Sequence, residues 1–78
     1  LRARGRVLVK MNVPKAALEA VLEVVPSMKA PTVAELAGGD SYAVETVVPK
    51  SEINTLIPQL KARGATDIIE LPISKIVP

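Results

Sequence analysis

Val13-Pro14-Lys15-Ala16-Ala17-Leu18 is followed 35 residues later by the similar stretch Val48-Pro49-Lys50-Ser51-Glu52-Ile53. In both copies an alternating run rich in β-branched residues precedes the Val-Pro-Lys segment, and apolar residues at helical spacing follow it. Proline is tolerated at the first turn of a helix but not inside a central strand. The repeat therefore predicts two strand-to-helix units.

The first unit has a clear apolar face on each of its elements. Alternation from Arg6 to Val13 predicts a strand covered on one side, with this face: Val7, Val9, Met11 and Val13. After Pro14, apolar residues at i, i+3, i+4 and i+7 predict a helix that ends near Pro26: Leu18, Val21, Leu22 and Val25.

Strand signals return in the middle of the chain. Residues 32–36 favour a short strand, Gly38-Gly39-Asp40 a hairpin turn, and residues 42–48 a third strand. The second helix is expected to begin near Ser51 as N-cap and to end at Gly64 as C-cap. Its apolar stripe is Ile53, Leu56, Ile57 and Leu60, and Pro58 should kink it. Residues 67–73 complete the series as a last strand.

Two successive βαβ halves with short connections predict an α+β fold, the ferredoxin-like βαββαβ sandwich. A four-stranded antiparallel sheet would carry both helices on one face and leave the other face open. The 78 residues are expected to form one domain. Because the chain starts with Leu1 and not Met, residues 1–5 are interpreted as a lead-in from a preceding domain.

The composition of the chain excludes several classes of function. The chain has no cysteine and no histidine, so disulfides, thiolate or imidazole metal sites and Ser-His or Cys-His catalysis are excluded, and a cytoplasmic setting is expected. Phe and Trp are absent, and Tyr42 is the only aromatic residue, so a base-stacking RNA surface is not expected. No apolar run approaches the length of a membrane span. These observations favour a binding or regulatory module over a catalyst.

Few residues remain for chemistry. Glu19 and Glu23 are four apart and suit a solvated helix face better than an acid/base pair. The loop from Met28 to Val33 places a hydroxyl and free backbone groups at the mouth of a strand, where a small polar ligand can bind. From spacing alone, the pattern favours Thr32 as an ordinary strand residue after a proline that forces extended backbone.

Taken together, the motifs resemble the C-terminal regulatory domain of the long form of ATP phosphoribosyltransferase, the first enzyme of histidine biosynthesis. The resemblance spans nearly the whole chain and rests on these segments: Met11-Asn12-Val13-Pro14, Ala30-Pro31-Thr32-Val33, Ala43-Val44-Glu45, Val47-Val48-Pro49, Leu60-Lys61-Ala62 with Gly64-Ala65, and Leu71-Pro72-Ile73-Ser74-Lys75-Ile76.

The resemblance implies a domain that binds histidine and inhibits catalysis in a separate N-terminal catalytic domain. Such domains meet in trimer-type contacts within a homo-hexamer, with the ligand between neighbours. It implies magnesium for the whole enzyme and no cofactor for this domain. From the residues themselves, no metal site and no nucleic-acid or membrane partner is expected. An oligomerisation-only module or a PII-like sensor of small ligands or metals remains the alternative.

The ligand-binding residues that the resemblance implies are Asn12, Met28, Ala30, Thr32, Val47 and Asp67. Asn12 takes the place of a polar or acidic residue near the amino group of the ligand. Thr32 and the backbone around Ala30 hold the polar ends, and Val47 and Asp67 line the same interface. Ala30 stands where many relatives have serine, which removes one hydroxyl.

Overall fold

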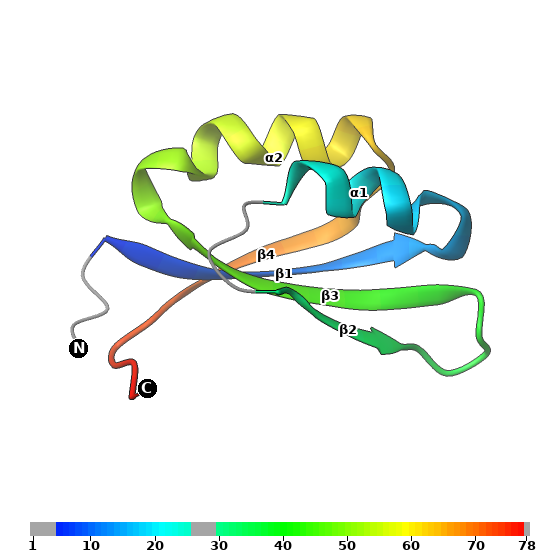
Figure 1. The fold of residues 1–78 in the computed structure, drawn as a ribbon, viewed down its shortest axis with the longest axis horizontal. Coiled ribbons are helices and arrows are strands. Elements are labelled where there is room, and N and C mark those ends of the chain that lie inside the picture. The colour runs from blue at the N-terminus through cyan, green and yellow to red at the C-terminus, as the bar shows by residue number, and fades with distance from the viewer. Residues whose placement is uncertain (1–4, 26–29, 78) are drawn as a thin grey trace.

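A four-stranded antiparallel sheet forms one layer of the molecule, and two helices cover one of its faces (Figure 1). The computed structural model describes residues 5–25 and 30–77. The elements in chain order are β1 (Arg6–Pro14), the 3-10 turn η1 (Lys15–Ala17), α1 (Leu18–Val24), β2 (Thr32–Glu35), β3 (Ser41–Pro49), the 3-10 turn η2 (Lys50–Glu52), α2 (Ile53–Ala62) and β4 (Thr66–Pro72).

The strand order β2-β3-β1-β4 is that of the predicted βαββαβ sandwich. β1 lies in the middle and pairs antiparallel with β3 from Arg6 opposite Pro49 to Pro14 opposite Ser41. On its other side β1 pairs with β4. β2 extends the sheet through β3 alone, so β2 and β4 are the edge strands.

The core lies between the sheet and the helices, where the sequence alternation places it. All four residues of the predicted β1 face are buried, and α1 and α2 cover them with Val21, Ile53, Leu56 and Leu60. Each side chain of this size contributes roughly 1.5–3 kcal/mol when it is fully removed from water. An aliphatic core of this kind holds both layers together without an aromatic residue.

Both helices begin in the same way, and the expected N-cap at Ser51 is wrong. Pro14 and Pro49 have φ of −58° and −60° and extended ψ, and each is followed by a 3-10 turn. In η2 the Ile53 N–H donates to the Lys50 carbonyl, and no side chain caps the turn. The tighter i+3 hydrogen bond satisfies one of the backbone donors that a serine cap would have served.

The end of α2 is as expected. Gly64 has φ of +109°, its N–H donates to the Lys61 carbonyl at 3.1 Å, and the Ala65 N–H donates to the Leu60 carbonyl at 3.0 Å. This pair of bonds is the Schellman motif, which needs a left-handed residue. Pro58 lies on the exposed side of α2, and the helix runs through it from Ile53 to Ala62.

β4 carries an irregularity that matters for the site. Its register with β1 shifts between Lys10 and Asn12, so Asp67 and Ile68 together oppose Met11. Asp67 has φ of +50°, the one positive φ among the described residues other than glycine. A β-bulge of this kind turns a side chain out of the regular alternation.

Candidate functional site

The face of the sheet that the helices leave uncovered carries most of the predicted ligand residues. Asn12 on β1 and Val47 on β3 belong to it by register, because Asn12 is opposite Ala43 and Val47 is opposite Leu8. Thr32 joins them from β2, opposite Glu45. Met28, the remaining predicted loop residue, lies outside the described residues. We call this surface the open face.

Two of the predicted residues are in direct contact. The Asn12 Nδ2 donates a hydrogen bond to Asp67 Oδ2 at 3.1 Å, and the Thr66 hydroxyl donates to the Asn12 backbone carbonyl at 3.4 Å. Thr66 is opposite Asn12 in the β1–β4 ladder, and the bulge in β4 brings the next residue, Asp67, within reach of Asn12 as well. The second carboxylate oxygen of Asp67 and the amide oxygen of Asn12 remain as acceptors. Two acceptors, one of them charged, suit an ammonium group.

Three other predicted residues line one hollow. Ala30, Thr32 and Val47 border a cavity of about 420 Å³ on the open face. Thr32 and Ala30 are exposed, and Val47 is half-buried. The cavity offers a hydroxyl group beside an apolar wall, which is the usual make-up of a small-ligand pocket.

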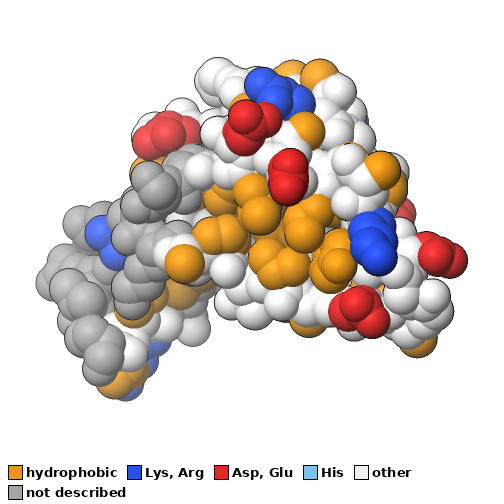
Figure 2. Space-filling view, turned by 45° about the vertical axis from the view of Figure 1, so that its right-hand side comes forward, with side chains coloured by type: hydrophobic (Ala, Val, Ile, Leu, Met, Phe, Trp, Pro, Cys, Tyr) orange, Lys and Arg blue, Asp and Glu red, His pale blue; other side chains and the backbone are white. Residues whose placement is uncertain are grey.

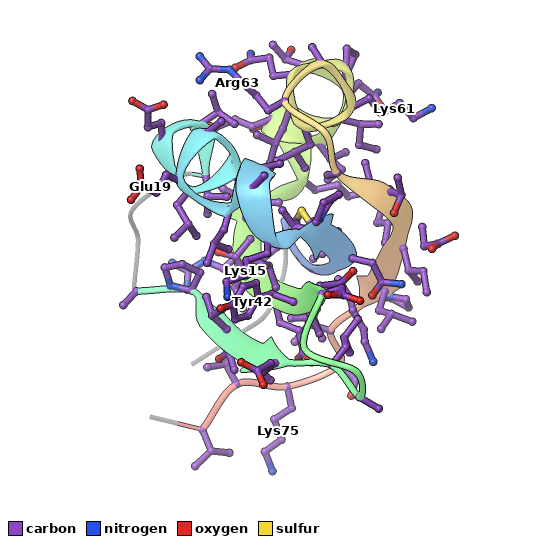
Figure 3. All side chains as sticks on the ribbon, turned by 90° about the vertical axis from the view of Figure 1, so that its right-hand side faces the viewer. Lys15, Glu19, Tyr42, Lys61, Arg63 and Lys75 are labelled. Carbon is purple, nitrogen blue, oxygen red and sulfur yellow. The ribbon has the colours of Figure 1, made fainter. Side chains whose placement is uncertain are left out.

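Sequence reasoning missed five residues of this cavity: Arg6, Leu8, Glu45, Thr46 and Ile76. The signal for three of them was present, because Arg6 and Leu8 share the parity of Asn12 on β1, and Glu45 shares that of Val47 on β3. Ile76 had no such signal, since it belongs to the irregular segment after β4. That segment lies beyond the sheet from the helices, with Lys75 projecting away from them (Figure 3).

The predicted residues therefore fall into two groups at a distance from each other. Asp67 is on edge strand β4 and Thr32 is on edge strand β2, with β1 and β3 between them. Three strand spacings separate them by about 14 Å. Because the Asp67 and Thr32 side chains are short, one molecule the size of an amino acid does not reach from one to the other within the same chain. The structure places the expected residues on one face but does not bring them together.

The surfaces outside the open face have fewer features of a binding site. A hollow of about 280 Å³ lies between the helices, lined by Val24, Ser51, Glu52, Thr55, Leu56 and Gln59, none of them a predicted site residue. Arg63, after α2, and Glu23 of α1 form an ion pair at 3.1 Å, but their side chains are 43% and 70% exposed, so the pair contributes little to stability. Tyr42 faces the α1 side of β3, so the open face has no aromatic platform (Figure 3).

Figure 2 shows that hydrophobic side chains also reach the surface on the side of the molecule toward the β2–β3 hairpin, among separate acidic and basic side chains. Within residues 5–25 and 30–77, no group of three or more acidic residues is placed to hold a metal ion. No helix in this part of the chain is long and apolar enough to cross a membrane.

Comparisons with known proteins agree with this fold. The family described as HisG, C-terminal domain, matches residues 3–75. The chain is 47% identical over 78 residues to an ATP phosphoribosyltransferase of Pelotomaculum thermopropionicum, and 45% identical over 75 residues to one of Pyrobaculum calidifontis. In each case it spans 27% of the length of the relative.

The fold is also that of a solved structure, Arabidopsis thaliana PII bound to citrate. The two agree with a TM-score of 0.77 over 95% of this chain and 82% of the PII chain. Their sequences are 18% identical, so the likeness concerns the fold alone.

Proposed function

Because the chain belongs to the HisG C-terminal domain family, we propose that it is the regulatory part of an ATP phosphoribosyltransferase and that it binds histidine, the end product of the pathway. In this proposal the transfer of the phosphoribosyl group, and the magnesium that assists it, belong to a separate catalytic domain of the same polypeptide. The present chain contributes binding and assembly.

The observation that carries the proposal is the division of the expected ligand residues into two groups on one face. Asn12 and Asp67 form one, and the cavity beside Ala30, Thr32 and Val47 forms the other. A second copy of the domain can place its Asn12 and Asp67 over the cavity of the first. The ligand then lies between neighbouring copies, as the trimer-type contacts of the family imply.

The exposed apolar side chains on the open face support the same arrangement. Leu71 and Ile69 of β4 are 41% and 47% exposed, opposite Leu8 and Lys10 of β1. Large apolar groups gathered on one face mark an interaction surface more often than isolated ones do. Contact between copies would remove them from water.

Each polar group of histidine has a partner in this arrangement. The carboxylate of Asp67, held by the Asn12 amide, receives the α-ammonium group, and the Thr32 hydroxyl and the backbone at Ala30 receive the polar groups at the other end. A charge-assisted hydrogen bond of this kind contributes roughly 1.5–3 kcal/mol. The apolar side of Val47 packs against the ligand's carbon atoms.

Inhibition follows from the position of the ligand. A molecule that touches two copies binds only the quaternary arrangement in which those copies are correctly placed. It shifts the equilibrium between arrangements by the ratio of its affinities for them. Catalysis is inhibited when the favoured arrangement is the one in which the catalytic domains are least active.

The full-length enzyme that carries this chain provides the test. Titration calorimetry with L-histidine should show binding, and Thr32→Ala should weaken both binding and inhibition. Thr55→Ala removes another exposed hydroxyl, on α2 and away from this cavity, and serves as the matched control. Unchanged inhibition in Thr32→Ala, with the control also unchanged, would count against this site.

A second candidate is an oligomerisation module without histidine binding. Ala30 favours it, because the alanine supplies no hydroxyl to the cavity, and so do the exposed leucine and isoleucine of β4. Light scattering that shows trimers or hexamers, together with no thermal shift on addition of histidine, would support this candidate over the first.

A further inference from the structure

Two charged side chains differ from all the others that the structure describes. Every other described Lys, Arg, Asp and Glu is exposed, whereas Arg6 and Glu45 are half-buried. Both line the 420 Å³ cavity of the open face. Neither forms an ion pair with another described residue. Glu45 is directly opposite Lys10 in the β1–β3 ladder, but the two side chains do not form an ion pair. Removing charges from water without a partner is unfavourable, so this placement points to a partner outside the described residues.

Arg6 and Glu45 lie at different positions along the strands that line this cavity. Arg6 is opposite Pro49 in the β1–β3 ladder, and Glu45 lies four residues earlier on β3. Four residues along the strand and one strand spacing put their backbones about 14 Å apart. Leu8 and Val47, a directly opposed pair, lie between them. Side chains of opposite charge thus face one cavity across an apolar strip.

We infer that Arg6 binds the α-carboxylate of the amino-acid effector and that Glu45 accepts a hydrogen bond from the N–H of its ring. This assignment rests on the proposed function and extends it to two residues outside the set implied by the family resemblance. Arg6 offers a planar pair of N–H donors that match a carboxylate. The α-ammonium group remains for Asp67 of a second copy.

The apolar walls fit the middle of such a ligand. Leu8 and Val47 form the floor, and Ile76 from the segment after β4 forms a side wall. Ile76 is half-buried although it follows the last strand. The C-terminal segment therefore encloses the ligand between the two charged ends.

Pairs of ligands and variants test the two contacts in the full-length enzyme. Arg6→Gln should weaken L-histidine binding about tenfold or more and leave binding of histidinol, which has no carboxylate, within about twofold of the unmodified enzyme. Glu45→Gln should weaken histidine binding about tenfold and leave binding of 3-(2-thienyl)alanine, whose ring has no N–H, unchanged. Arg63→Gln and Glu70→Gln are the matched controls, because both side chains are exposed away from the cavity.

The outcomes separate this inference from the proposed function. If the unmodified enzyme binds histidine but Arg6→Gln and Glu45→Gln bind it as well as their controls do, the inference is wrong and the proposed function stands. If Arg6→Gln weakens histidine and histidinol equally, the contact with the carboxylate is wrong. If Glu45→Gln weakens histidine and thienylalanine equally, the contact with the ring is wrong. If the unmodified enzyme does not bind histidine, both proposals fail. Melting temperatures of the variants identify any that do not fold.

Discussion

Exchanging the carboxylate of Asp67 with the amide of Asn12 tests whether the charge at this pair receives the ammonium group. The two side chains are 3.1 Å apart, so Asn12→Asp alone places two carboxylates in contact. Like charges at about 4 Å repel by roughly 1 kcal/mol in water and 4 kcal/mol in half-buried surroundings. Because Asp67 is exposed, we expect a loss of about 1–2 kcal/mol in the free energy of unfolding.

Asp67→Asn should have a different effect. Asparagine tolerates the positive φ of position 67 and can still accept the bond from Asn12, so stability should change by about 0.5 kcal/mol or less. Histidine binding should weaken about 10- to 100-fold, since a charged partner is lost. The double variant Asn12→Asp with Asp67→Asn restores one carboxylate and one amide. Its stability should return to within about 0.5 kcal/mol, and much of the affinity should return with it.

Denaturant unfolding measures the stabilities, and titration calorimetry on the full-length enzyme measures the affinities. Two results would refute the reasoning. If Asp67→Asn binds histidine as the unmodified enzyme does, the carboxylate has no role in binding. If the double variant is stable but binds histidine no better than Asp67→Asn, the carboxylate must be at position 67 to receive the ammonium group, and a carboxylate at position 12 does not replace it.

Three further predictions concern folding and assembly. Gly64→Ala should lower the free energy of unfolding by about 1–2 kcal/mol because of its positive φ, and by more because the new Cβ lies 3.0 Å from the Ala17 Cβ. Gly38→Ala has the same backbone penalty but no contact within 4 Å, so it is the control. Equal losses in urea unfolding would exclude the contact with Ala17. Leu60→Ala should cost about 2–5 kcal/mol, since Leu60 is fully buried, while Ile69→Ala at 47% exposure should cost less than 1 kcal/mol by the same measurement. Leu71→Glu on the open face should shift the assembly toward smaller species in light scattering, and an unchanged mass would argue that the copies meet elsewhere.

The fold could be predicted largely because apolar periodicity determined it. Alternation assigned the buried face of β1 correctly, and the glycine at the end of α2 adopts the left-handed conformation expected of it. The start of α2 could not be foreseen in the same way. Ser51 has the chemistry of a cap, but Pro49 leads the chain directly into a 3-10 turn whose backbone bonds take its place.

The sequence indicated candidate site residues but not how they lie relative to one another. The resemblance implied Asn12 and Asp67 separately, and only the bulge in β4 shows that they are in contact. Arg6 was predicted only as the first residue of a strand, because one charged residue in an alternating run has no pattern that identifies a cavity. The cavity that Arg6 lines is also bordered by Ile76, from the segment after β4, which carries no periodic signal.

The central position of β1 sets the order in which the domain can mature during synthesis. Of the four strands β1 is made first, yet its partners end at Pro49 and Pro72, so neither edge of β1 is paired until much of this domain has been made. Such distant pairings slow folding and leave strand edges exposed to other nascent chains. Until β4 has been made, this strand would be a natural target for chaperones.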